Sequence, residues 1–247
     1  MFSNRYIFIY SAVLVVVVAV ILALAATLLK PFQDKNIRIE KMQYILTSAN
    51  IENNTENAED LYEKHVVEEI IINKEGEITH VYSKGEFLQG DKRAFDIDFK
   101  AELKKLKKGE KADLPCFKIV KNTDTLMSFP MQGIGLWGAI WGYISLEKDF
   151  NTIAGSVFDH KGETPGLGAE ISTAEFQKQF INKKIFDENE NFVSVKLVKG
   201  GAKNSNILEE HAVDAISGGT ITSNGTSNMI DSCLRIYIPF FQKNMNK

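Results

Sequence analysis

Cysteine, histidine and clustered positive charge are all scarce in this sequence of 247 residues. Two cysteines, Cys116 and Cys233, are too few for a disulfide framework or a cysteine-rich metal site, although they leave a single disulfide open. The four histidines form no H-x-x-x-H or H-E-x-x-H pair, which argues against a zinc site. No G-x-S-x-G sequence occurs, so a hydrolase nucleophile elbow has no support either.

Charge is nearly absent from the first thirty residues and slightly negative in the rest. The sequence carries 29 Lys and Arg against 32 Asp and Glu, and residues 1–30 contribute only Arg5 and Lys30 to these. The remainder lacks the clustered basic surface typical of a nucleic-acid-binding protein. Hydrophobic residues make up 44% and charged residues 25%, which is typical of a globular chain and excludes wholesale disorder.

Residues 7–29 form a run of 23 residues without a charge, IFIYSAVLVVVVAVILALAATLL. At about 1.5 Å per residue, such a helix crosses the hydrocarbon core of about 30 Å. A cleaved signal peptide is the alternative, because Arg5 supplies a basic start and residues 23–25 (ALA) resemble a cleavage site. Signal peptides usually have an apolar region of only about 7–15 residues, so the length favours a retained transmembrane helix after a short tail at 1–6. The lysines after the span leave its orientation open, since long domains translocate largely regardless of charge.

The pattern after the span predicts an α+β fold with a largely antiparallel sheet. We expect a connecting helix and loop over 30–57 and one domain over 58–247. Predicted helices cover residues 31–50, 98–112, 172–182 and 224–242, the last interrupted at Pro239. Predicted strands cover residues 65–73, 77–84, 117–120, 125–129, 137–146, 151–159 and 192–198. Ser172, with Glu175 three residues later, predicts a capping box.

Three glycine-containing segments are candidates for a site. Residues 133–138 (GIGLWG) fit the dinucleotide fingerprint by letter, but a strand-like segment follows where a helix is required, so that interpretation fails. Residues 162–170 (GETPGLGAE) indicate a tight loop, or a loop whose backbone approaches a flat ligand. Residues 214–225 (DAISGGTITSNG) indicate a hydroxyl-rich helix cap, or an anion site at a helix start whose hydroxyls could also carry a phosphate.

Taken in order, these segments resemble the C subunit of the sodium-translocating NADH:quinone oxidoreductase. The resemblance covers essentially the whole chain. It rests on the single span, the exit at residues 29–33 (LKPFQ), residues 135–138 (GLWG) with 141–143 (WGY), residues 163–168 (ETPGLG) and residues 217–220 (SGGT).

The resemblance implies FMN joined through its phosphate to the hydroxyl of Thr220, made by a flavin transferase that uses FAD. Gly219 stands where the family pattern has Ala, and we expect the modification to survive this change; Thr222 is the alternative acceptor. The transferase would recognise Asp214 and Ser217. The implied cofactor-binding residues are Thr220, Ser217, Gly218, Gly219, Thr222, Leu136, Trp137, Thr164, Gly166, Leu167 and Gly168. No catalytic or metal-ligating residue is implied.

The resemblance further implies an electron carrier that does not hold the NADH site. Its FMN domain would lie on the periplasmic face of the inner membrane, anchored in lipid, beside the B, D and E subunits within the membrane. Electrons would arrive from an iron–sulfur centre and leave to a second covalent FMN on the B subunit, then to quinone. One alternative is the G subunit of an Rnf-type ferredoxin–NAD complex, which shares the FMN domain. Another is a membrane-anchored binding domain without flavin.

Overall fold

The computed structural model describes residues 3–87, 89 and 91–245. The chain divides into two compact units, Met1–Lys41 and Met42–Lys247, and each is described by itself.

One long helix, α1 (Asn4–Ser48), contains the apolar run. Its most apolar stretch has a mean hydropathy of 3.2, and among the described residues it is the one helix long and apolar enough to cross a membrane. Pro31 lies inside this helix, so the prediction of a separate helix from residue 31 is wrong. A proline removes a single backbone hydrogen bond, and the turns before it are rich in Leu and Ala, which favour the helix.

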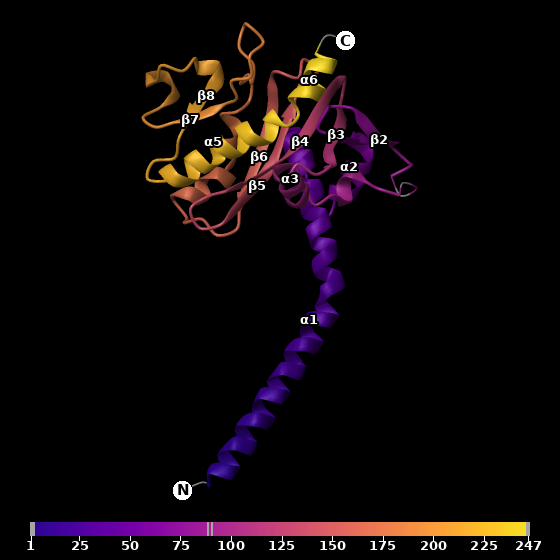
Figure 1. The fold of residues 1–247 in the computed structure, drawn as a ribbon, viewed down its shortest axis with the longest axis vertical. Helices are drawn as coiled ribbons and strands as arrows, with labels where there is room; N and C mark the ends of the chain where they lie inside the picture. The colour runs from indigo at the N-terminus through magenta and orange to yellow at the C-terminus, as the bar shows by residue number, and fades with distance from the viewer. Residues whose placement is uncertain (1–2, 88, 90, 246–247) are drawn as a thin grey trace. The chain divides into compact units, whose positions relative to one another are not determined.

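A six-stranded antiparallel sheet forms the centre of the second unit and confirms the predicted α+β class (Figure 1). The strand order is β2-β1-β3-β4-β5-β6. The strands are β1 (Val66–Ile72), β2 (Ile78–Ser83), β3 (Leu114–Lys121), β4 (Asp124–Ile134), β5 (Ala139–Leu146) and β6 (Ile153–His160). Each strand predicted between residues 65 and 159 is therefore present.

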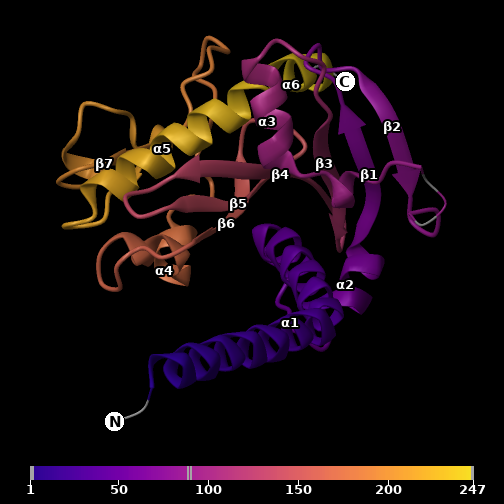
Figure 2. The ribbon, with the colours of Figure 1, turned by 60° about the horizontal axis from the view of Figure 1, so that its bottom comes forward.

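Neighbouring residues along a strand point to opposite sides, and each face of the sheet borders a hydrophobic core, although the edge strand β2 has no buried residue. One face packs against α3 (Phe99–Lys107), α5 (Thr220–Arg235) and α6 (Ile238–Asn244). The other face packs against the last turns of α1 and against α2 (Ala58–His65) (Figure 2). On β5, for example, Tyr143 lies in the second core and Ile144 in the first.

Residues 42–51 contribute to the second core. Ile45 and Leu46 are fully buried there. The hydroxyl of Ser48 lies 2.9 Å from Ser128 Oγ and 2.8 Å from Ser145 Oγ, between the helix and the sheet. The compact unit therefore begins before residue 58, where the sequence analysis starts the domain.

Helix starts differ from their predicted positions. The short helix α4 (Ala174–Lys178) is capped by Thr173, whose hydroxyl accepts from Phe176 N at 3.3 Å, so the predicted cap at Ser172 is wrong. Ser172 belongs to a preceding 3₁₀ turn and donates to Ala169 O. Helix α5 begins at Thr220, four residues before its predicted start, and a break after Arg235 separates it from α6.

The segment between β6 and α5 holds a small parallel pair, β7 (Lys196–Val198) and β8 (Ala212–Asp214). Only the last three residues of the strand predicted over 192–198 are in β7. Cys116 and Cys233, for which a disulfide was open, are free thiols and both are buried.

Candidate functional site

Three segments that are distant in the sequence meet at the start of α5. They are the turn between β4 and β5 (residues 134–138), the loop after β6 (residues 161–168) and the first turn of α5. Gly135 N donates to Gly138 O at 2.8 Å and closes the first turn. Leu167 N and Ala169 N both donate to Thr164 O at 3.1 Å, which shapes the second segment. The sheet and α5 thus assemble most of the predicted cofactor-binding residues in one place.

The side chain of Glu163 joins the three segments. It is 4% exposed. Trp137 N donates to its Oε1 at 2.8 Å, and the Thr222 hydroxyl donates to its Oε2 at 2.6 Å. Its own backbone N–H donates to His160 Nδ1 at 3.1 Å. Both carboxylate oxygens accept, as those of an ionised carboxylate do.

Two glycines leave the space that this carboxylate occupies. A Cβ at Gly168 would lie 2.5 Å from Glu163 Oε2 and 2.5 Å from Thr222 Oγ1. A Cβ at Gly135 would lie 2.5 Å from Glu163 Oε1. A side chain at either position would displace the Glu163 carboxylate, so glycine permits this close approach.

Thr220 is the first residue of α5 and is exposed. The residue before it, Gly219, is in the N-cap position, and because glycine has no side chain it cannot hydrogen-bond to the N–H groups of the first turn. Backbone N–H groups at a helix start lack intrahelical partners and, with the helix dipole, favour an anion such as a phosphate. Ser217 and Gly218 precede it on the surface, and Gly218 has a φ of 75°. Thr220 is therefore not the helix cap that the simpler sequence interpretation made it.

Thr222 and Asp214 lie in different surroundings from Thr220. Thr222 is buried and its hydroxyl is donated to Glu163, which argues against it as the alternative acceptor. Asp214 ends β8, where its Oδ1 accepts from Ala202 N at 2.7 Å and its own N–H donates to Gln179 Oε1 at 2.8 Å. The structure thus places Asp214 outside the convergence of the three segments.

Large apolar side chains are exposed around Thr220. Trp137 is 68% exposed, and Leu136 and Leu167 from the two loops are also exposed. Exposed apolar groups gathered in one region are typical of a binding surface. A flat indole beside glycine-rich backbone suits a planar aromatic ligand. Thr164 and Gly166 supply that backbone on the surface, and Gly166 has a φ of 75°, whereas Gly168 is buried.

Sequence reasoning missed three residues of this region. Glu163 stands in the ETPGLG segment but was given no role, because nothing local shows that its partners are Trp137 and Thr222. Ile134 (76% exposed) and Ile221 (also exposed) flank the site as well. Nothing in the sequence shows that a single isoleucine is exposed beside a site, because this depends on the fold.

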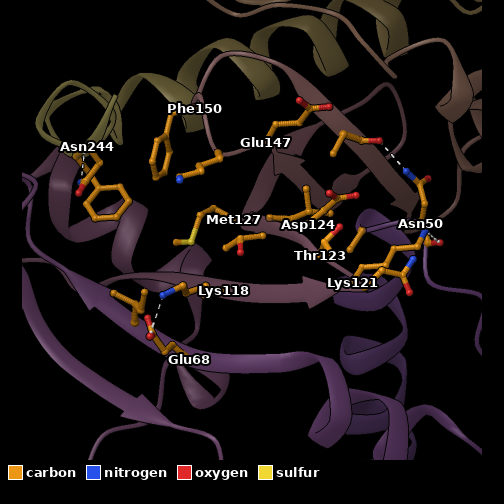
Figure 3. A pocket seen from close by; sticks show the side chains of 18 of the residues that line it. Asn50, Glu68, Lys118, Lys121, Thr123, Asp124, Met127, Glu147, Phe150 and Asn244 are labelled. Atoms are coloured by element: carbon orange, nitrogen blue, oxygen red, sulfur yellow. Dashed lines mark hydrogen bonds and ion pairs between the residues drawn. The ribbon is translucent and has the colours of Figure 1, made fainter. Parts of the chain in front are cut away.

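A separate open pocket of about 1060 Å³ lies at the other end of β4 (Figure 3). Asp124, the first residue of β4, lines it, whereas the last residue, Ile134, flanks the site, so the two are roughly 33 Å apart along the strand. Lys118 pairs with Glu68 at 3.0 Å inside the pocket, so these charges satisfy each other. None of the predicted site residues is among the described residues that line it.

The residues at the start of α5 fit a flavin mononucleotide. The exposed Thr220 hydroxyl and the uncapped helix start suit its phosphate. The exposed indole of Trp137 suits its ring system, and the exposed Gly166, where no atom lies within 4 Å of the position of a Cβ, leaves backbone open to it.

Comparison with known proteins agrees with this class of site. The sequence pattern of the FMN-binding domain family matches residues 135–235, which contain all three segments except Ile134. This fold and site define an FMN-binding domain.

Proteins that are similar to this chain over most of its length identify a narrower family within this class. The C subunit of the Na(+)-translocating NADH-quinone reductase of Vibrio parahaemolyticus is 33% identical over 224 residues, covering 87% of this chain and 84% of that protein. The C subunit from Neisseria meningitidis is 30% identical over 247 residues, covering 95% and 94%. The crystal structure of the C subunit from Parabacteroides distasonis is similar with a TM-score of 0.73 and 37% identity, over 86% of this chain and 96% of that one. The chain belongs to the family formed by the C subunits of the Na(+)-translocating NADH-quinone reductase.

Proposed function

We propose that this chain is the electron-transfer subunit of a sodium-translocating NADH–quinone reductase and carries FMN in phosphoester linkage to Thr220. The relatives are subunits of that reductase, which supports the same place for this chain. The observation that carries the attachment is the exposed Thr220 hydroxyl at an uncapped helix start, where three glycine-containing segments meet. The neighbouring hydroxyl of Thr222 is buried and already donated.

The chain's own residues would accept the cofactor from the flavin transferase and orient it. Thr220 would supply the oxygen of the phosphoester and release its hydroxyl proton to solvent, with FAD as the donor of the FMN phosphoryl group and AMP as the leaving group. Once bound, FMN supplies a group that accepts and releases electrons singly or in pairs. The N–H groups at the start of α5 then face its phosphate. Trp137 and Leu167 offer apolar contact to its rings, and the covalent bond retains it at an exposed site.

The membrane arrangement is part of the proposal. The apolar part of α1 anchors the chain in the inner membrane, and the domain faces the periplasm. The B, D and E subunits within the membrane are its proposed partners, and a flavin transferase is its partner during maturation, with Asp214 and Ser217 as recognition residues. The chain would carry electrons between centres of the complex and leave NADH binding to another subunit. Protease added outside intact spheroplasts should digest the domain; protection until lysis would contradict the periplasmic side.

Substitution of Thr220 by valine tests the attachment. Valine keeps the branched shape and removes the hydroxyl, so Thr220→Val should carry no covalent flavin while remaining folded. The full-length protein, co-expressed with a flavin transferase, would be denatured and examined for in-gel flavin fluorescence and intact mass. The matched control is Thr222→Val, which should keep a fluorescent band at some level because its hydroxyl is not the acceptor. A band retained in Thr220→Val and lost in Thr222→Val would move the site.

A further inference from the structure

Glu163 lies beneath the proposed flavin site and is only 4% exposed. Its two oxygens bond to two different segments, one to Trp137 N at 2.8 Å and one to the Thr222 hydroxyl at 2.6 Å. The two partners belong to the turn that presents the exposed indole and to the helix turn that presents the Thr220 hydroxyl. Both groups that would meet the flavin are thus tied to one side chain.

The negative charge of this carboxylate is stabilised by hydrogen bonds and not by a neighbouring cation. In the part of the chain that the structure describes, no Lys or Arg forms an ion pair with it, and its contacts are donors from Trp137 and Thr222. A buried negative charge that is not paired with a cation acts on nearby groups through a medium less polar than water. Adding an electron to a nearby group is then less favourable.

We propose that Glu163 is a positioning residue of the flavin site, which holds the Trp137 turn against the first turn of α5 and lowers the reduction potential of the flavin. This inference rests on the proposed function and extends it to a residue that the sequence analysis left without a role. Its two parts are separable by substitution. Glu163→Ala removes the bridge, whereas Glu163→Gln keeps an oxygen for Trp137 N and removes the charge.

The bridge is tested without flavin, in the full-length chain expressed without a transferase. Hydrogen exchange of the peptide containing Trp137 should be roughly tenfold faster in Glu163→Ala, since loss of a buried hydrogen bond of about 1.4 kcal/mol opens that amide. Glu163→Gln should stay close to the wild type. The matched control is Glu175→Gln, which removes an exposed carboxylate from α4. Unchanged exchange in Glu163→Ala would overturn the bridging role.

The charge is tested in flavin-loaded chains by spectroelectrochemical titration. The reduction potential of Glu163→Gln should be more positive than that of the wild type, and that of Glu175→Gln should be unchanged. A potential in Glu163→Gln that is unchanged or more negative would overturn the electrostatic role, even if Glu163→Ala proves too unstable to study. A wild-type chain that takes up no flavin from a competent transferase would instead overturn the proposed function. The exchange experiment separates these failures, because it requires no flavin.

Discussion

Thr220 and Thr222 are two positions apart, yet one hydroxyl faces solvent and the other is buried. Residues two apart on an α-helix point in nearly opposite directions, so the difference follows from the helix starting at Thr220. The sequence pattern predicts this helix only from residue 224, which places both threonines in a loop, so that only the family resemblance favoured Thr220 over Thr222. Locating the helix start is therefore what distinguishes the two hydroxyls.

Gly219, where the family pattern has alanine, is closely surrounded in this chain. A Cβ there would lie 2.9 Å from Cγ2 of Ile216 and 3.4 Å from Gly168 N. The Ile216 side chain is branched at Cβ and has little freedom to move aside. The size of the side chain at position 219 is therefore limited by the isoleucine at position 216.

We expect Gly219→Ala to destabilise the protein by about 1 kcal/mol, as overpacking does. In an Ile216→Ala background the same change should cost about 1 kcal/mol less, because the opposing methyl group is gone. A double-mutant cycle of urea unfolding, followed by tryptophan fluorescence, measures this coupling. An equal cost in both backgrounds would show that the two side chains do not compete for space.

Among the helices, α1 combines two functions along one continuous element. Its apolar part has the composition of a membrane span, while its last turns bury Ile45 and Leu46 in the core of the second unit. From the sequence, these last turns were predicted to belong to a connecting segment. A stripe of apolar residues indicates that a helix face is buried, but it does not indicate which surface covers it.

Ser48 fixes these last turns of α1 to the sheet through the hydroxyls of Ser128 and Ser145. Ser48→Ala would leave both hydroxyls buried without this partner, so we expect a loss of about 1–3 kcal/mol in the free energy of unfolding. The neighbouring Thr47 is exposed, and Thr47→Ala should cost far less. Chemical denaturation of the full-length protein in detergent compares the two. Equal losses would mean that the hydrogen bonds of the Ser48 hydroxyl do not stabilise the protein.

For the whole molecule, the class of fold could be predicted and the long-range contacts could not. Strand-like runs of residues, two of them flanking a hairpin turn at residues 74–76, identified all six strands of the main sheet. Glycine-rich segments located most of the site. The bond between Glu163 and Thr222 joins residues 59 positions apart, and no local pattern encodes it. Helix starts were misplaced where such tertiary contacts, and not local propensity, extend the helix.

The order of the strands also determines when a modification site can exist. From β3 to β6, each strand pairs with the next one in the chain, so this part of the sheet needs only local closures, which form quickly. The last of these strands ends at His160, whereas the helix that presents Thr220 begins sixty residues later. During synthesis, the turn at residues 134–138 and the loop containing Glu163 are therefore made before the first turn of α5, which is the third segment of the site.

In a pulse–chase experiment, covalent flavin should appear only after the sheet resists protease, and earlier labelling would contradict this order. The presence of attached flavin would then identify the chains in which the sheet and the start of α5 have already folded together.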